Sequence, residues 1–255
     1  MAKIAVLIPS TSKGRRWASV KESYLYLHTL KTFILTYDSE HEWRFYIGID
    51  RGDSVYDKPE TKQYLERMMS VMKNTSIEFI YMDGITKGHL TVMWNRLFEK
   101  SYSDGFDYFF QCGDDITFET KGWANDCILA LEPSKGVGMT GPINNNARIL
   151  TQSFVSRRHM DLFGFYFPQE IINWCCDDWI NEVYIQLGRF FPLKQHRCLN
   201  VGGEPRYEIN NNPSFRDRKF SESLAKLRSE SSQIAKRDYL KAVKKMSEGF
   251  SAADS

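Results

Sequence analysis

Short apolar runs alternate with helix-forming segments along the first half of this 255-residue chain. The runs are predicted to form strands at 4–8, 43–49, 77–82 and 108–111, and helical periodicity fills the segments between them, at 20–37, 61–73 and 89–101. Such alternation predicts an α/β fold with a mostly parallel central sheet and helices on both faces. Ligands of such sheets bind beyond the carboxyl ends of the strands, so we expect a site in the loops that follow the strands.

The second half of the chain is less regular. Helices are expected at 123–131, 159–163 and 178–186, short strands at 136–141 and 151–156, and loops at 142–146 and largely from 194 to 207. We expect one domain over 1–215, made of two halves at 1–125 and 126–215. The remaining segment, 216–255, is strongly charged and is expected to form a helical tail.

Composition narrows the class of protein. The 34 basic residues nearly balance the 32 acidic ones, so the chain lacks the basic excess of a general nucleic-acid binder, and no nucleic-acid partner is expected. The five cysteines form no CxxC pair, which favours free thiols in a reducing compartment. The first apolar run has only five residues, and no stretch approaches the ~18 apolar residues of a membrane span. We therefore expect a soluble, cytoplasmic protein without a transmembrane segment.

The sharpest local signal is Gly113-Asp114-Asp115, which follows the apolar and aromatic run at 106–111. Two adjacent carboxylates at the end of a buried strand repel one another and lose hydration, which is tolerable when a cation or a hydrogen-bonding ligand lies against them. Oxygen ligands of this kind suit Mg²⁺ or Mn²⁺ carrying a diphosphate. The plainer alternative is that the pair only forms a turn or caps a helix.

Other strand-end residues are expected to join this site. Asp50 could accept hydrogen bonds from a base or a ribose, or could simply cap the Arg51-Gly52 turn. The loop from Ser10 to Arg16 offers hydroxyls, N–H groups and positive charge for a diphosphate, although it lacks the spacing of a Walker A motif. The further candidates for nucleotide-sugar binding are Pro9, Thr11, Asp83, Lys87, Asn95 and Arg96.

A second acidic signal is Trp174-Cys175-Cys176-Asp177-Asp178-Trp179. The two tryptophans could form a platform for a sugar, and one of the acids could deprotonate an acceptor hydroxyl. We slightly prefer Asp178 as that base and keep Asp177 open. The alternative is a helix cap flanked by core tryptophans. His196 is a candidate third contact to a metal or phosphate, although a lone histidine is more often structural.

In the order of these motifs, from Ile8-Pro9-Ser10 through Asp50, 88–96 and 113–115 to Asp177-Asp178, the chain resembles the GT-A glycosyltransferases, in particular the family 2-like inverting enzymes. It is also similar to glycosyltransferases encoded by large DNA viruses. The resemblance covers about residues 3 to 207.

This resemblance implies a GT-A catalytic domain whose first half binds a nucleotide sugar, UDP-sugar favoured, and whose second half binds a glycan or glycoprotein acceptor. It also implies Mn²⁺ or Mg²⁺ as cofactor, with Asp115 as a metal ligand and Asp114 near the ribose, the phosphate or the metal. Gly113 departs from the family's Asp-x-Asp pattern because it replaces the first carboxylate.

Two other functions remain open at this point. A sugar-1-phosphate nucleotidyltransferase also uses an α/β sheet with Mg²⁺, although its Gly-rich signature after the first strand is poorly matched by Ser10-Thr11-Ser12. A non-catalytic carbohydrate-binding protein on a decayed transferase fold is the second, and Gly113 is the feature that favours it.

Overall fold

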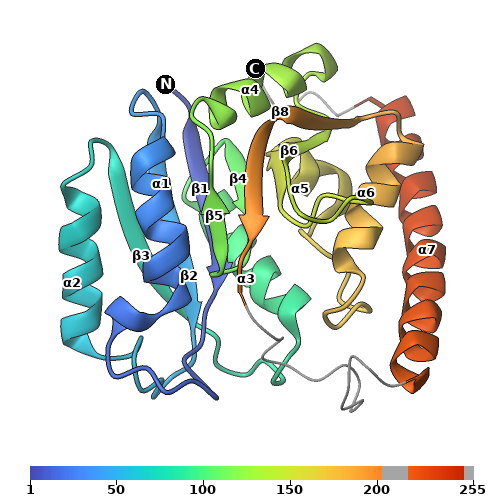
Figure 1. Cartoon of the computed structure of the whole chain (residues 1–255). Helices are drawn as coiled ribbons and strands as arrows, with labels where there is room; N and C mark the ends of the chain where they lie inside the picture. Colours follow the sequence, from blue (N-terminus) through green and yellow to red (C-terminus); the bar gives the residue numbers. More distant parts are fainter. Residues whose placement is uncertain (203–217, 250–255) are drawn as a thin grey trace.

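The computed structural model of the protein describes residues 1–202 and 218–249. Its centre is one eight-stranded sheet with the strand order β3-β2-β1-β4-β7-β6-β8-β5 (Figure 1). The strands are β1 (Lys3–Pro9), β2 (Glu42–Ile49), β3 (Thr75–Tyr81), β4 (Tyr108–Gln111), β5 (Ile116–Phe118), β6 (Met139–Ile143), β7 (Ser153–Ser156) and β8 (Phe190–Asn200). The mostly parallel α/β sheet predicted from the sequence is confirmed.

The first four strands are parallel to one another. β1 lies between β2 and β4, so that Ile4 is opposite Trp43 on one side and Tyr108 on the other. β2 continues the parallel pairing to β3, whereas β7 is antiparallel to β4. The carboxyl ends of β1, β2, β3 and β4 therefore meet at one edge of the sheet, the lower edge in Figure 1.

Helices cover both faces of the sheet. The α-helices are α1 (Lys31–Thr36), α2 (Pro59–Ser70), α3 (Leu90–Ser103), α4 (Trp123–Leu131), α5 (Arg158–Phe163), α6 (Cys176–Gln186) and α7 (Arg218–Ser247). Three further helical turns are η1 (Val20–Glu22), η2 (Leu25–Leu30) and η3 (Glu132–Ser134).

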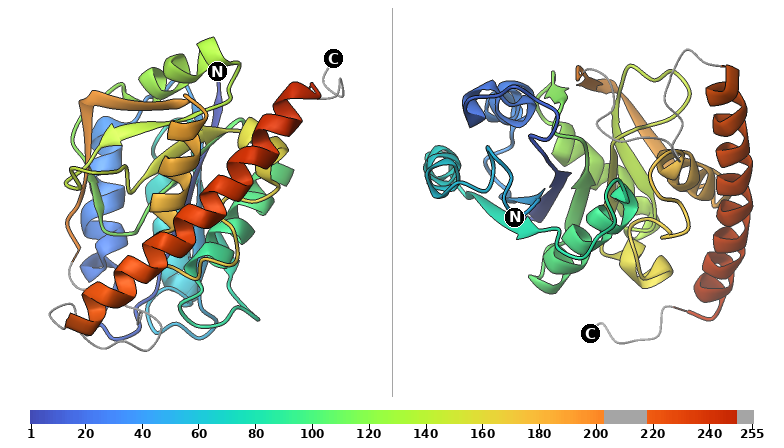
Figure 2. Two further views of the ribbon diagram at one scale, coloured as in Figure 1. Left: turned by 90° about the vertical axis from the view of Figure 1, so that its right-hand side faces the viewer. Right: turned by 90° about the horizontal axis from the view of Figure 1, so that it is seen from below.

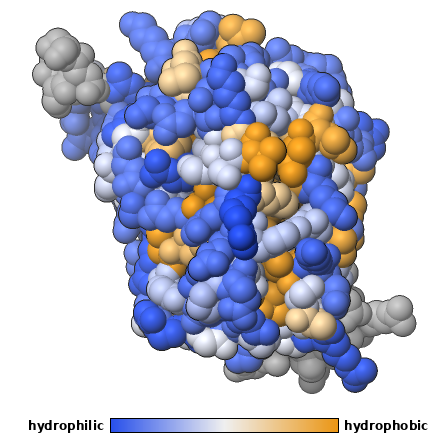
Figure 3. Space-filling model, turned by 90° about the vertical axis from the view of Figure 1, so that its left-hand side faces the viewer, coloured by the Kyte–Doolittle hydropathy of each residue, from blue (hydrophilic) through white to orange (hydrophobic). Residues whose placement is uncertain are grey.

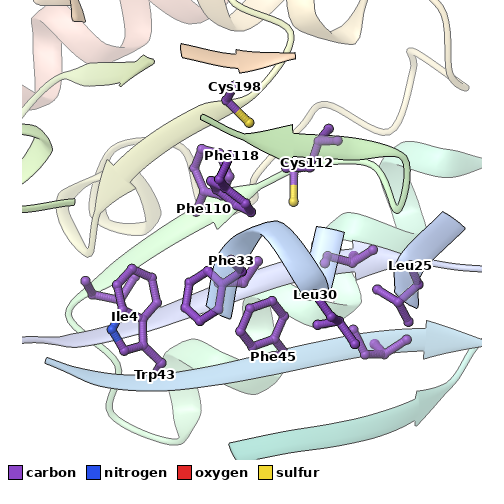
Figure 4. Packing of buried hydrophobic residues seen from close by; sticks show 14 of the residues in the cluster. Ile4, Leu25, Leu30, Phe33, Trp43, Phe45, Phe110, Cys112, Phe118 and Cys198 are labelled. Carbon is purple, nitrogen blue, oxygen red and sulfur yellow. The ribbon is translucent and has the colours of Figure 1, made fainter. Parts of the chain in front are cut away.

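The side chains of β1 show how the two layers form. Ile4, Val6 and Ile8 belong to one apolar cluster, whereas Ala5 and Leu7 belong to the cluster on the opposite face, because successive strand side chains point to opposite sides. In the first cluster, the Phe33 ring lies 4.7 to 5.7 Å from the rings of Trp43, Phe45 and Phe118 (Figure 4). A sheet buried on both faces holds its strand ends rigidly, which is what a site at those ends needs.

The helix predicted at 20–37 is broken in the structure. Ser23 has an extended backbone (φ −72°, ψ 151°), and its hydroxyl donates to the carbonyl oxygen of Val20 at 2.7 Å. Beyond it, Leu25–Leu30 is a π-helix, which is wider than an α-helix and changes the angle between successive side chains. As a result Leu27, expected on the buried face, is 39% exposed.

The loop predicted from 194 to 207 is wrong for its first part. Phe190–Asn200 is strand β8, parallel to β6 and antiparallel to β5. Its polar residues misled the prediction: Lys194, Gln195 and Arg197 are exposed because β8 lies near the sheet edge, while Leu193, His196 and Cys198 are buried. Residues 203–207 of that predicted loop, and the predicted domain boundary at 215, lie outside the described residues.

Helix α7 crosses the outer side of α6 on the flank of the molecule opposite α2 (Figure 2). Ala235 and Ala242 are fully buried at this contact and at the contact with α5, and their small size lets α7 pack closely. On the other flank, β3 is an edge strand, and the face around α2 and β3 is mostly hydrophilic with hydrophobic side chains between (Figure 3). Within the described ranges, no helix combines the length and the apolar character that a membrane span requires.

Candidate functional site

A cavity of about 850 Å³ opens at the carboxyl ends of β1, β2 and β4, where the sheet geometry predicts a site. Its walls come from the loops after these strands, from the loop before α3, and from the segment that leads into α6. Of the residues predicted from the sequence, the cavity is lined by Pro9, Ser10, Thr11, Asp50, Lys87, Asp115, Trp174 and Asp177.

The two adjacent acids after β4 have different surroundings. Asp114 is fully buried, and its Oδ2 accepts a hydrogen bond of 2.6 Å from the hydroxyl of Ser10 at the end of β1. Asp115 is half-buried and lines the cavity. Asp114 therefore joins two strand ends inside the protein, and Asp115 is the carboxylate that a ligand can reach.

Two glycines lie against the Asp115 carboxylate. A Cβ at Gly113 would stand 2.5 Å from its Oδ1, and a Cβ at Gly202 would stand 2.5 Å from its Cγ. Any larger residue at 113 would push the Asp115 side chain away. The departure of Gly113 from the Asp-x-Asp pattern thus has a steric reason in this structure.

Asp53 fastens the loop after β1 to the loop after β2. Its carboxylate accepts hydrogen bonds from the backbone N–H of Ser12 (2.7 Å), the Ser12 hydroxyl (2.7 Å) and the N–H of Tyr56 (2.8 Å). Burial of Asp53 opposes its charge, but these hydrogen bonds outweigh burial and lower its pKa. Asp53 also lines the cavity, and the feature of the sequence that pointed to it was its place in a strand-end loop.

Thr11 and Asp50 meet at the mouth of the cavity. The Thr11 hydroxyl lies 3.2 Å from Asp50 Oδ2 and 3.3 Å from Asp53 Oδ2. Asp50 is exposed, so its carboxylate is accessible to a ligand. Lys13, Arg15 and Lys87 bring positive charge to the same walls, which favours an anionic ligand.

Besides Asp114, three residues predicted for nucleotide-sugar binding lie outside the cavity lining. Asp83 forms an ion pair with Arg51 at 2.6 Å. Arg96 donates to the carbonyl oxygens of Tyr81 (3.0 Å) and Asp83 (2.8 Å) and so holds the chain after β3. Asn95 is buried and bonds the backbone of Phe167 in both directions, at 2.8 Å each. Asn95 and Arg96 thus hold backbone segments, whereas Asp83 is an exposed carboxylate paired with Arg51, which lines the cavity.

The acids at the start of α6 also differ. Asp177 lines the cavity, whereas Asp178 does not and forms ion pairs with Arg148 (2.5 Å) and Arg228 (3.7 Å). Burial, and then the negative charge of Asp178, raise the pKa of Asp177 to about 6. The backbone N–H groups that hydrogen-bond its carboxylate, and then the positive charge of Arg148, offset this only in part. Asp177 is therefore a carboxylate that can exchange a proton near neutral pH.

The two tryptophans of this segment also differ in their surroundings. Trp174 is half-buried and lines the cavity. Trp179 is fully buried, its ring lies 5.5 Å from that of Phe163, and its Nε1–H donates to Asp238 at 3.3 Å. Trp174 can contact a ligand, and Trp179 belongs to the core.

His196 is placed away from the cavity lining. Its ring nitrogens lie 3.0 Å from the Thr120 hydroxyl and 2.8 Å from Asp126 Oδ2, near the start of α4. Over residues 1–202 and 218–249, no group of three or more His, Cys, Asp or Glu side chains is arranged to hold a metal ion. Among the residues predicted as metal ligands, only Asp115 lines the cavity.

Two amide side chains that line the cavity, Gln152 and Asn200, were not predicted from the sequence. Gln152 Nε2–H donates to Asn200 Oδ1 at 2.7 Å, and Asn200 Nδ2–H donates to Thr151 at 3.0 Å. Asn200 ends β8, the strand that was predicted as a loop, so neither it nor Gly202 could be placed beside Asp115 from the sequence.

The sheet order and the helices on both of its faces define the fold as that of the GT-A glycosyltransferases. Two proteins of known structure that share it are TarS of S. aureus and GalNAc-T7. TarS is 12% identical, with a TM-score of 0.52 over 79% of this chain and 37% of that chain. Its 1–349 fragment in complex with UDP-GlcNAc is 13% identical, with a TM-score of 0.53 over 80% and 60%.

GalNAc-T7, solved with UDP, GalNAc and Mn²⁺, is 9% identical, with a TM-score of 0.57 over 78% of this chain and 43% of that chain. The chain thus spans between about a third and three fifths of the length of these solved chains. No known family profile and no curated protein matches the sequence. The comparisons do not support the expected likeness to viral enzymes.

Proposed function

We propose that this protein is a glycosyltransferase that moves a sugar from a nucleotide diphosphate sugar to an acceptor hydroxyl. The observation that carries the proposal is that one cavity contains both Asp115, set between two glycines, and Asp177, whose pKa is raised to about 6. Asp115 can hold a cation that stabilises the leaving diphosphate, and Asp177 can accept the proton of the attacking hydroxyl.

The donor would lie across the ends of β1 and β2. Asp50, which lines the cavity and is exposed, would bind the base or the ribose, and Lys13, Arg15 and Lys87 would supply the charge that a diphosphate requires. We propose a UDP-sugar, because TarS is solved with UDP-GlcNAc and GalNAc-T7 with UDP.

The residues present fit a divalent cation held in part by its ligand. Mg²⁺ and Mn²⁺ sites that carry phosphates need only one or two carboxylates, since phosphate oxygens and waters complete the coordination. Asp115 would provide the carboxylate, and the fully buried Asp114 would hold the loop rather than the ion. A bound cation would neutralise charge that develops on the leaving diphosphate.

Asp177, rather than Asp178, is the proposed base. The carboxylate of Asp178 is occupied by its ion pairs with Arg148 and Arg228. Asp177 would take the proton from the acceptor hydroxyl, whose oxygen would displace the diphosphate in one step with inversion at the anomeric carbon. Trp174 on the same wall would pack on the sugar. A glycan or glycoprotein is the proposed acceptor.

The test begins with the donor. Titration calorimetry with UDP, GDP and UDP-sugars, with and without Mn²⁺, should show metal-dependent binding of the uridine nucleotides. Release of UDP from the bound sugar nucleotide should then follow, at a slow hydrolytic rate without an acceptor. Pyrophosphate release from NTP and sugar phosphate would instead indicate a nucleotidyltransferase, and binding without nucleotide release would indicate a carbohydrate-binding protein.

The variant Asp177→Asn tests which of the two acids, Asp177 or Asp178, is the general base. We expect kcat for transfer to fall by about 10²- to 10⁴-fold with donor binding retained, the usual loss when a general base is removed. Asp178→Asn is the matched variant and should retain more activity. A greater loss in Asp178→Asn, with Asp177→Asn near wild type, would refute the assignment of the base.

A further inference from the structure

The segment that carries Asp177 begins at a residue with unusual backbone geometry. Cys175, the residue before α6, has φ +69° and ψ 12°, in the left-handed region that residues other than glycine rarely adopt. Such a conformation persists only where neighbouring contacts hold it. Cys175 is 3% exposed and lines the same cavity as Asp177.

Helix α7 supplies one of those contacts from 56 residues further along the chain. The Ser231 hydroxyl, on a side chain that is 1% exposed, donates to the carbonyl oxygen of Cys175 at 2.9 Å. The same oxygen accepts the N–H of Trp179 at 3.0 Å, the first hydrogen bond of α6. The carbonyl that sets the start of α6 is therefore held from two directions.

The other side of the segment is held by the loop before α3. Asn173 Nδ2–H donates to the carbonyl oxygen of Gly88 at 3.0 Å, and Asn173 Oδ1 accepts the N–H of Trp174 at 2.6 Å. Residues 173–175 are thus tied to the cavity wall on one side and to α7 on the other. Asp177 follows two residues later, so its carboxylate position depends on both ties.

The register of α7 on α6 is set by independent contacts. Asp238, 2% exposed, accepts the Trp179 indole N–H at 3.3 Å and pairs with Arg237. Ser232 donates to Glu182 at 2.7 Å further along α6. These contacts hold α7 on α6 and do not involve residues that line the cavity. The helix can therefore stay docked when the hydrogen bond of Ser231 is removed.

We infer that Ser231 is a positioning residue for Asp177, and that α7 is in this way a working part of the active site. The inference rests on the proposed function for its kinetic consequence, but not for its structural one. Removal of the hydroxyl takes away one of the two hydrogen bonds to the Cys175 carbonyl described above and loosens the left-handed turn, so that the carboxylate of Asp177 is less well aligned with the acceptor.

The test compares Ser231→Ala with Ser232→Ala, which removes a hydroxyl of the same helix that does not touch Cys175. In Ser231→Ala we expect kcat to fall by about 10- to 100-fold while the KM for donor and the Kd for UDP stay within twofold, because misplacement of a reacting group lowers the rate more than the affinity. Ser232→Ala should keep the kcat of the wild type even if its Tm falls as far.

Hydrogen exchange provides a readout that does not depend on activity. The amides of residues 176–179 should exchange faster in Ser231→Ala than in the wild type or in Ser232→Ala. Should Ser231→Ala be too unstable to assay, Ser231→Cys, close in volume and a weak donor, should show the same pattern. Unchanged exchange and unchanged kcat in the Ser231 variant would overturn the inference. Failure of the wild type to bind or cleave any UDP-sugar would overturn the proposed function, while the exchange result would still decide the role of Ser231.

Discussion

The hydroxyl of Ser10 at the end of β1 donates to the fully buried carboxylate of Asp114 after β4, at 2.6 Å. This bond joins the ends of two neighbouring strands at the cavity, which Ser10 lines. It turns the first of two adjacent acids into a structural anchor and leaves the second, Asp115, on the cavity wall.

Ser10→Ala should lower the free energy of unfolding by about 1–3 kcal/mol, because it removes a buried hydrogen bond to a carboxylate. Urea unfolding followed by tryptophan fluorescence measures this. Ser229→Ala, at an exposed position of α7, is the control and should stay within about 0.5 kcal/mol of the wild type. Equal stabilities of the two variants would contradict the anchoring role.

Gly202→Ala should displace the Asp115 carboxylate, since the new Cβ would overlap it. We expect Mn²⁺-dependent UDP binding to weaken by about 10- to 100-fold, the usual range when a group that orients a metal ligand is disturbed. Gly105→Ala is a useful control, because its φ of +81° makes the substitution costly in stability although the space around it is open and it lies outside the cavity lining. UDP affinity unchanged in Gly202→Ala would show that Asp115 does not contact the metal.

Asp177→Asn should stabilise the protein at alkaline pH. The folded-state pKa of Asp177, about 6, lies above the ordinary value of 3.8, so its ionisation opposes folding as pH rises through 6. The variant removes this cost. Its free energy of unfolding should match the wild type near pH 4 and exceed it by about 1–3 kcal/mol at pH 8. A constant difference between the two proteins across this range would mean that Asp177 titrates normally.

The stability that depends on His159 should change with pH in the opposite direction. The ring is buried; its Nε2–H donates to the Tyr166 carbonyl at 3.0 Å, so Nδ1 accepts from the Tyr184 hydroxyl at 2.8 Å. Burial lowers its pKa to about 4, below the ordinary 6.5. The neutral ring therefore contributes fully to the free energy of unfolding above pH 6.5. As the pH falls towards 4, this contribution should be lost, by up to about 3 kcal/mol. His159→Phe should remove this acid loss in urea unfolding measured at each pH, and a loss as large as in the wild type would assign it to another group.

The parallel half of the fold could be predicted because its central strands are largely buried and read as apolar runs, as in 4–8. β8 could not be predicted, because its exposed polar residues Lys194, Gln195 and Arg197 resemble those of a loop. The π-helical stretch at 25–30 could not either, since apolar spacing does not distinguish it from an α-helix.

The candidate site, too, could be predicted from the sequence only in part. Strand ends placed Ser10, Asp50 and Asp115 together because parallel strands end at one edge. The choice between Asp177 and Asp178 needed the structure, because it depends on Arg148 and Arg228, which reach Asp178 from distant parts of the chain. No local pattern encodes such a contact.

We propose that Asp115 and its two glycines form the metal end of a nucleotide-sugar site. A crystal grown with UDP and Mn²⁺, with anomalous diffraction recorded to locate manganese, would decide this. We expect the manganese peak within coordination distance of the Asp115 carboxylate and of the diphosphate, with uridine towards Asp50. Manganese and UDP bound away from Asp115, or UDP in the cavity with no manganese beside that carboxylate, would contradict the claim.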